Sequence, residues 1–195
     1  WVGTTNGLFR IADGAAHGIT QADGLVDNYV RSILEAPDGA IWIGHALGVD
    51  RWKGGRIESV DLAARGHPPS SVLSLANARD GGMWLGTYDQ GVLHIGTRDG
   101  GALPAQIDRR DGLPSNHVRA IAQANDGTLW IGTAEGLVGW KDGELRRLGH
   151  DDGLPSDFIR ALHEARDGSL WIATSGGIAH RAVDGRVQSW TRDSG

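Results

Sequence analysis

Cysteine is absent from the 195 residues, so disulfide bonds and thiolate chemistry are excluded. No stretch approaches the roughly 18 consecutive apolar residues that a membrane-spanning helix requires. The first residues do not have the pattern of a signal peptide. The lack of cysteine does not by itself fix the cellular compartment.

An excess of positive charge is also missing. The chain has 19 Lys and Arg against 24 Asp and Glu, a formal net charge of −5, and the two signs are interspersed. A nucleic-acid-binding domain carries a basic patch, and a segment that binds anionic lipids is polybasic. We therefore expect no nucleic-acid partner and no direct membrane-surface contact for these residues.

Glycine, in contrast, is abundant, with 31 residues that recur in phase. Residues 112–148 show the pattern most clearly, as four short apolar runs separated by turns. The runs are 118–123, 129–133, 136–141 and 144–148. Asp126-Gly127 and Asp142-Gly143 predict tight hairpins, because glycine readily adopts the positive φ that such turns need. Each unit is therefore expected to form four antiparallel strands, and no run is long enough for an ordinary helix of about 11 residues.

A tryptophan marks the second strand of every unit. The five are Trp1, Trp42, Trp84, Trp130 and Trp171, separated by 41, 42, 46 and 41 residues. A period of this length with four strands per unit predicts the blades of a β-propeller. A parallel β-helix would have a shorter period, and a two-sheet sandwich would not repeat. Five tryptophans at one repeat position indicate packing between blades rather than five binding sites, and Trp52 and Trp140 are assigned the same role.

The repeats predict an all-β protein in which residues 1–195 form a single propeller segment. Four complete four-stranded blades are expected at about 24–62, 66–107, 112–148 and 153–190, after a three-stranded partial blade at about 1–21. An insertion at 96–103 lengthens one repeat, and 191–195 is a polar end. Residues 1–4 align with residues 130–133, so the sequence begins inside a blade and is expected to be a piece of a longer protein.

The blade count leaves two arrangements open. The segment closes as five blades, one lacking its inner strand, or it is part of a larger ring completed by further sequence or by another copy. An open ring would expose the apolar faces of its two end blades, which favours self-association. One functional hypothesis is therefore a structural or protein-interaction propeller that oligomerises.

The best-defined repeats carry a resemblance to a known family. Gly112-Leu113-Pro114-Ser115-Asn116, followed by Leu129-Trp130-Ile131-Gly132-Thr133, resembles the two-component regulator propeller repeat. Residues 153–178 match almost as well. Residues 24–49 match with Val26 in place of proline, and residues 66–92 match least well. The resemblance covers essentially the whole chain.

This resemblance implies a role. Repeats of this family form the extracytoplasmic sensor region of bacterial membrane receptors, where a transmembrane helix leads to a histidine kinase or a diguanylate cyclase. The implied function is a non-catalytic, ligand-sensing propeller on the periplasmic or extracellular side of the inner membrane, with polysaccharide fragments among the family's inputs. No kinase, nucleotide or cyclase motif occurs here, so the output domain would lie elsewhere in the full-length protein. No cofactor is expected.

Candidate binding residues lie where the first strand of each blade begins. In a propeller, the loops before the first strand and after the second share one face, and recognition residues gather on such loops. The residue before the first strand is Tyr29, Ser71, His117 or Phe158, and one position into the strand it is Arg31, Leu73, Arg119 or Arg160. Converging arginines would suit an anion or a polyhydroxylated sugar. The alternative is that each arginine pairs with a nearby aspartate or loop carbonyl.

The loops after the second strand supply further candidates, namely His45, Tyr88, Asp89, Gln90 and Glu135. Tyr88 with Asp89 and Gln90 resembles a sugar platform with a polar rim, whereas the alternative is a solvated loop. The predicted ligand-binding set is Tyr29, Arg31, His45, Tyr88, Asp89, Gln90, His117, Arg119, Glu135, Phe158 and Arg160.

No metal or catalytic site is predicted. The eight histidines lack metal-ligand spacing, the Asp-Gly pairs lack the alternating Asp and closing Glu of a calcium loop, and no Gly-x-Ser-x-Gly elbow occurs. Asp167 and Gly168 are adjacent, unlike the Asp box of sialidases. The enzyme alternative is a streptogramin-lyase-like propeller, which needs a His/Glu pair and a divalent ion, and His117 with Glu135 is the one pair to nominate.

Overall fold

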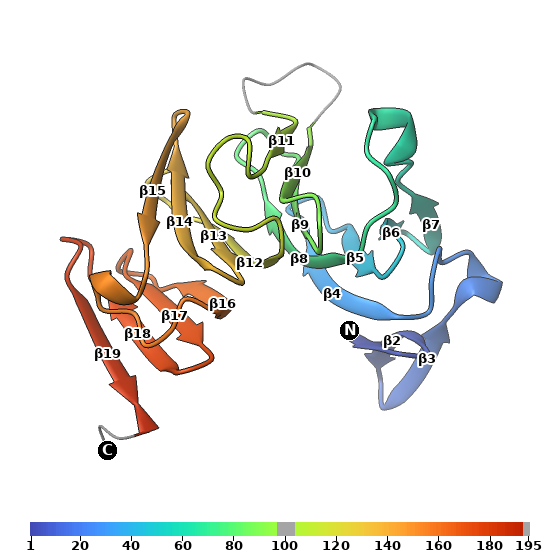
Figure 1. Ribbon diagram of the computed structural model, residues 1–195. Coiled ribbons are helices and arrows are strands. Elements are labelled where there is room, and N and C mark those ends of the chain that lie inside the picture. Colours follow the sequence, from blue (N-terminus) through green and yellow to red (C-terminus); the bar gives the residue numbers. More distant parts are fainter. Residues whose placement is uncertain (97–103, 193–195) are drawn as a thin grey trace.

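The structure, a computed structural model that describes residues 1–96 and 104–192, consists of five antiparallel sheets (Figure 1). We call them blades 1 to 5 in chain order. Four blades have four strands and the first has three, so the predicted all-β propeller architecture is confirmed. The predicted insertion and polar end fall mostly on residues 97–103 and 193–195, which lie outside the described residues.

The strand bounds follow the repeat. Blade 1 comprises β1 (Val2–Thr4), β2 (Gly7–Ala12) and β3 (Ala15–Ile19). Blade 2 comprises β4 (Val30–Glu35), β5 (Ile41–His45), β6 (Val49–Lys53) and β7 (Arg56–Ser59). Blade 3 comprises β8 (Val72–Asn77), β9 (Met83–Thr87), β10 (Val92–Ile95) and β11 (Gln106–Ile107). Blade 4 comprises β12 (Val118–Gln123), β13 (Leu129–Thr133), β14 (Gly136–Lys141) and β15 (Glu144–Leu148). Blade 5 comprises β16 (Ile159–Glu164), β17 (Leu170–Thr174), β18 (Gly177–Arg181) and β19 (Val187–Thr191).

Short 3-10 turns, which the sequence pattern did not predict, occupy three of the connections between blades. They are η1 (Gln21–Asp23), η2 (Ala63–Arg65) and η3 (His150–Asp152). Each is ended by a glycine with positive φ, such as Gly24 at 107°. No helix in the described part of the chain is long and apolar enough to cross a membrane.

The Asp-Gly pairs form the predicted turns. In the hairpin between β14 and β15, Asp142 and Gly143 both have positive φ, 52° and 89°, as a two-residue turn that follows the strand twist requires. Between β12 and β13, Asp126 instead accepts a hydrogen bond from the backbone N–H of Thr128 at 2.8 Å. The same dipeptide thus serves two kinds of turn.

The blades stand side by side in an arc. Their innermost strands, β1, β4, β8, β12 and β16, contact one another in that order, and blades 1 and 5 lie at the two ends (Figure 1). Within the described residues the chain therefore forms an open arc, which favours the larger ring over the closed five-blade arrangement.

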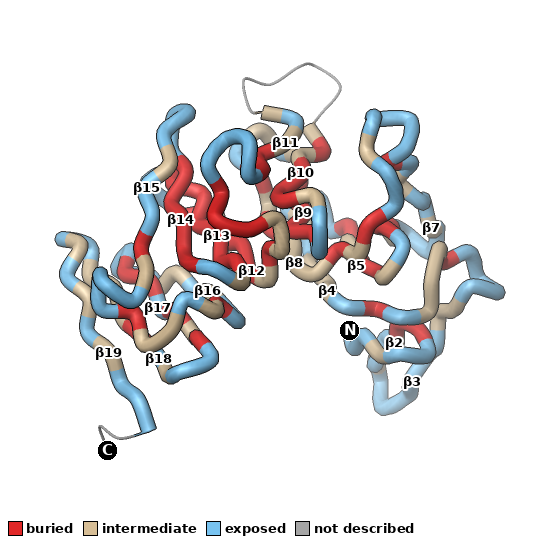
Figure 2. The backbone as a smooth tube through the Cα atoms, in the orientation of Figure 1, coloured by how far each residue is buried: buried red, intermediate tan, exposed pale blue. Residues whose placement is uncertain are grey.

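The core is divided among the junctions between blades. Four apolar clusters each lie between two consecutive blades, and burial is greatest in the central blades (Figure 2). Trp84 and Trp130 are buried between neighbours, whereas Trp171 of blade 5 is 41% exposed. The repeated tryptophan is thus fully packed in the central blades 3 and 4, whereas Trp1 of the three-stranded blade 1 is 37% exposed although it contacts Trp52 of the following blade.

Candidate functional site

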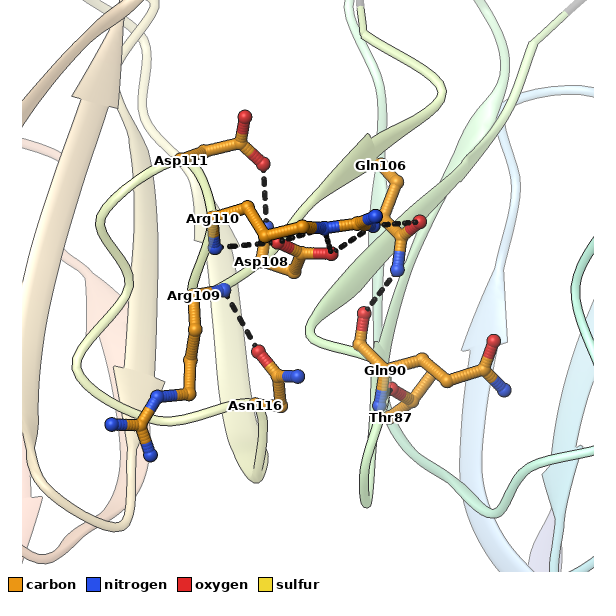
Figure 3. Close-up of polar contacts among 8 residues, drawn as sticks. All are labelled: Thr87, Gln90, Gln106, Asp108, Arg109, Arg110, Asp111 and Asn116. Carbon is orange, nitrogen blue, oxygen red and sulfur yellow. Dashed lines mark hydrogen bonds and ion pairs between the residues drawn. The ribbon is translucent and has the colours of Figure 1, made fainter.

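A repeated set of hydrogen bonds fixes the connection that leads into the first strand of a blade. Before blade 4, the backbone N–H of Arg109 donates to Asn116 Oδ1 at 2.9 Å, and that of Asp108 donates to Asp111 Oδ2 at 2.9 Å (Figure 3). Equivalent bonds join Gln21 to Asn28 and His150 to Asp157, both at 2.8 Å. The Asn or Asp that ends the repeat motif therefore closes the loop.

The residue after this Asn or Asp is held at the start of the first strand. The backbone N–H groups of Tyr29, His117 and Phe158 donate to the side chain two residues earlier, at 3.0, 3.3 and 3.2 Å. The acceptors are Asp27, Ser115 and Ser156. This local bonding places a different side chain at the same position of each blade.

The next feature is a β-bulge in the first strand of blades 2 to 5. The register between first and second strands shifts between Val30 and Ser32, Val72 and Ser74, Val118 and Ala120, and Ile159 and Ala161. The extra residue in each case is Arg31, Leu73, Arg119 or Arg160. A bulge re-aims the side chain that it carries, and so turns these residues out of the regular alternation.

Three of these four residues, all except Arg160, line one cavity, here called the mouth cavity. Its volume is about 350 Å³, and its walls come from blades 2, 3 and 4. The lining residues are Tyr29, Val30, Arg31, Leu73, Tyr88, His117 and Arg119. Five of the predicted site residues are therefore brought together.

The arginines around the mouth cavity stack on aromatic rings. The Arg31 guanidinium lies 4.4 Å from the Tyr29 ring centroid, and those of Arg119 and Arg160 lie 5.1 and 5.4 Å from that of Phe158. None of the three forms an ion pair with a carboxylate among the described residues. The buried Nε of Arg119 has no hydrogen-bond partner. The alternative prediction, pairing with a nearby aspartate, is thus not what the structure shows.

His117 completes the polar wall. Its ring lies 4.6 Å from that of Tyr88, and its Nε2 is 3.3 Å from Arg119 Nη1. Burial, together with the positive charge of Arg119, lowers the pKa of His117 below its ordinary value. His117 is therefore neutral at pH 7 and can accept a hydrogen bond from Arg119.

The structure corrects the prediction for His45. It was expected on an exposed loop, but it is the last residue of β5, has no exposed surface and lies 2.9 Å from the equally buried Asp50 (Nε2 to Oδ2). A side chain enclosed in this way cannot contact a ligand in the mouth cavity.

Five other predicted residues are not part of the lining of the mouth cavity, namely Asp89, Gln90, Glu135, Phe158 and Arg160. Asp89 accepts a hydrogen bond from Ser70, and the Gln90 side chain donates to the carbonyl of Pro68 at 2.8 Å. Both side chains thus stabilise the connection that leads into blade 3. Glu135 lines a separate cavity of about 470 Å³ with Arg147. The His117/Glu135 pair of the enzyme alternative therefore does not share a cavity, and the described residues contain no group of three His, Asp or Glu able to hold a metal ion.

Four segments of the chain match the family described as two component regulator propeller. They are residues 24–46, 66–89, 112–135 and 153–176. Among curated proteins, a sequence search finds no match.

Several solved structures are similar. The extracellular domain of the hybrid two component system BT3049 from B. thetaiotaomicron is 25% identical, with a TM-score of 0.85 over 100% of this chain and 27% of that one. The corresponding domain of BT4673 from the same organism is 20% identical, with a TM-score of 0.81 over 97% and 29%. Virginiamycin B lyase from Staphylococcus aureus is 18% identical, with a TM-score of 0.75 over 96% and 63%. The last two show a shared fold only, and this chain spans less than a third of either extracellular domain.

Proposed function

The chain carries four repeats of the two component regulator propeller family, and from that premise we propose that it is a ligand-binding part of a bacterial receptor's sensor region. Its ligand binds in the mouth cavity and is an anion or an anionic carbohydrate. The binding segment lies on the periplasmic or extracellular side of the membrane, and a kinase or cyclase elsewhere in the protein responds to it. No catalytic step is assigned.

The observation that carries this proposal is the set of guanidinium groups without carboxylate partners. Arg31 and Arg119 lie in a cavity whose other walls are aromatic or apolar, and a buried N–H of Arg119 is unsatisfied. A buried donor without a partner is uncommon in native structures. A planar, multi-donor guanidinium fits carboxylate, sulfate or phosphate oxygens. The cavity is therefore best matched by a ligand with negative charge.

Replacing Arg119 with glutamine tests the proposal. Removing a charge-assisted hydrogen bond costs about 1.5–3 kcal/mol, so affinity for sulfated or phosphorylated disaccharides is expected to fall roughly 10- to 150-fold. The measurement is isothermal calorimetry against sulfated, phosphorylated and neutral disaccharides. Arg65→Gln, on an exposed turn outside the cavity, is the matched control. Equal binding by both variants, or preference for the neutral sugars, contradicts the proposal.

Binding of an anion in the mouth cavity is expected to strengthen as the pH falls. The pKa of His117 is lowered in the folded protein, so protonation adds positive charge beside the ligand only on the acid side of 6.5. Without ligand, the unfolded chain binds this proton more readily, so the same group favours folding above 6.5 and loses that contribution below it. Affinity measured from pH 5 to 8 should vary less in His117→Gln than in the parent. A parent profile as flat as that of the variant would exclude His117 from the site, with His17→Gln as the exposed control.

Self-association is a second proposed property, favoured by the exposed face of blade 5. Trp171, Ile178 and Trp190 are 41, 49 and 40% exposed there, and contiguous apolar surface of this kind marks interaction sites. Light scattering over a concentration series is expected to show a dimer that Trp190→Lys weakens. A monomer at all concentrations contradicts this second proposal and leaves the first untouched.

A further inference from the structure

The surroundings of the repeated tryptophan can be compared from one blade to the next. In blades 2 to 5 the cross-strand neighbour of this tryptophan in the third strand is Arg51, His94, Gly139 or His180. In blade 1 the Arg10 guanidinium lies 6.0 Å from the Trp1 ring. In blades 3 and 5 the histidine ring covers the tryptophan, with centroids 4.5 and 4.7 Å apart. In blade 4 the position is Gly139. Trp130 therefore has no covering side chain from its own blade.

The following blade differs at the same junction. One residue further along the third strand, blades 2, 3 and 4 present Trp52, Ile95 and Trp140 to the tryptophan of the preceding blade. Trp52 and Trp140 lie 4.8 and 6.0 Å from Trp1 and Trp84, and Ile95 shares a core cluster with Trp42. Blade 5 instead presents Arg181, whose guanidinium lies 5.0 Å from the Trp130 ring. The junction between blades 4 and 5 thus differs from the other junctions at two positions, Gly139 and Arg181.

Together these changes leave a cavity of about 560 Å³ between blades 4 and 5. Trp130 and Leu145 supply apolar wall. The charged residues of the lining are Lys141, Arg146 and Arg181, together with the carboxylates Asp142 and Glu144. The buried Nε of Arg181 has no hydrogen-bond partner. Neither arginine forms an ion pair with a carboxylate in the described part of the chain. The cavity thus offers guanidinium donors without hydrogen-bond partners, although the charge of Arg181 also interacts with Asp184.

We propose that this junction cavity is a second binding site, and that it takes an acidic sugar. The carboxylate would accept hydrogen bonds from Arg181 and Arg146, because a guanidinium fork matches carboxylate geometry. The carbon skeleton packs against Leu145 and the edge of Trp130, and the hydroxyl groups donate to Glu144. The volume lies within the range of about 300–1,000 Å³ that is usual for small-molecule sites. This site shares no residue with the mouth cavity and does not depend on the function proposed there.

Calorimetric titration with D-glucuronate and D-galacturonate tests the inference, with D-glucose as the neutral comparison. At least one uronate is expected to bind at least tenfold more tightly than glucose. Gly139→His, which installs the side chain of blades 3 and 5, should reduce uronate affinity at least tenfold, because its Cβ would lie 2.9 Å from Trp130 Cζ3 and so displaces that ring, and its imidazole enters the cavity. Arg181→Ile, which installs the residue of blade 3, should do the same. Arg166→Ile, at an exposed position of the same blade, should leave the affinity unchanged.

Three results would overturn the inference. They are an absence of binding by both uronates, equal affinity for glucose, and uronate affinity that Gly139→His leaves intact. Uronate binding lost in Arg119→Gln but kept in Gly139→His would move the sugar to the mouth cavity, and would support the function proposed there. If Arg181→Ile does not fold, Arg181→Lys keeps the charge, removes the unsatisfied Nε and should still lose most of the affinity.

Discussion

Replacing His45 with leucine is expected to destabilise the protein by about 3–5 kcal/mol, since it removes one partner of a buried pair and strands the other. Asp50 has no exposed surface, and its Oδ2 accepts a hydrogen bond from the backbone N–H of Val26 at 2.8 Å. The same oxygen lies 2.9 Å from His45 Nε2, a close contact without hydrogen-bond alignment, and Asp50 Oδ1 and His45 Nδ1 also lack a hydrogen-bond partner. The melting temperature of a protein of this size should fall on the order of 10 °C, measurable by calorimetry or circular dichroism.

The other blades have different residues at the positions of His45 and Asp50, which indicates that these two residues function together. Where blade 2 has His45, blades 3 to 5 have a threonine whose hydroxyl donates to the carbonyl of a turn glycine. These threonines are Thr87, Thr133 and Thr174, with bonds of 2.8, 2.9 and 3.0 Å. Where blade 2 has Asp50, blade 4 has Val138, and where it has Val26, blade 4 has Pro114. A proline has no N–H to donate, so the departure at Val26 is explained by the carboxylate it serves.

This comparison suggests a variant in which all three residues are replaced together. His45→Thr, Asp50→Val and Val26→Pro together convert the site to the chemistry of blade 4, and apolar replacements of buried ion pairs are often neutral or stabilising. The triple variant is expected to unfold within about 1 kcal/mol of the parent or above it, by denaturant titration. A triple variant no more stable than His45→Leu would show that the pair does not hold the Val26 loop in the manner described.

The sequence repeat was enough to predict the architecture, because its signals come from residues that are close together in the chain. Short apolar runs, Asp-Gly turns and phased tryptophans specify strands and their order, and residues at equal phase, such as Tyr29, His117 and Arg119, were correctly expected at one end of the blades. Their role in ligand binding stays a prediction. The strand bulges at Arg31 and Arg119 left no recognisable signal, because a bulge depends on the register between two strands.

Contacts between side chains that are far apart in the sequence were harder to predict. His45 follows the Trp-Ile-Gly pattern at the position of a threonine, which suggested a loop residue, and only the fold reveals that Asp50 faces it from the next strand. Asp89 and Gln90 looked like a polar rim, but they bond to the connection into blade 3 through Ser70 and Pro68. The signal that could have found His45 was the joint departure at positions 26, 45 and 50.

The glycine that follows the repeated Trp-Ile or Trp-Leu is expected to tolerate no side chain wherever a blade follows. A Cβ at Gly132 would lie 2.5 Å from Ile159 Cγ2, and one at Gly86 would lie 2.8 Å from Val118 Cγ1 and 3.2 Å from the Val118 carbonyl oxygen. At Gly132 the obstacle is Ile159, the β-branched residue that begins the next blade, whereas at Gly86 the Oγ of Ser74 in the same blade lies even closer to the added Cβ than Val118 does. The glycine therefore sets how closely two first strands approach the axis of the arc.

Gly132→Val should accordingly cost about 3 kcal/mol, at the upper end of the usual penalty for overpacking. Blade 5 supplies the control, because it carries Ala173 at this position, half-buried and without a following blade among the described residues. Ala173→Val is expected to change the free energy of unfolding by less than about 1 kcal/mol in dilute solution. If Gly132→Val is tolerated equally well, the blades do not pack through this contact. If Ala173→Val destabilises only at concentrations where the protein self-associates, a second copy covers blade 5 there as closely as one blade covers the next.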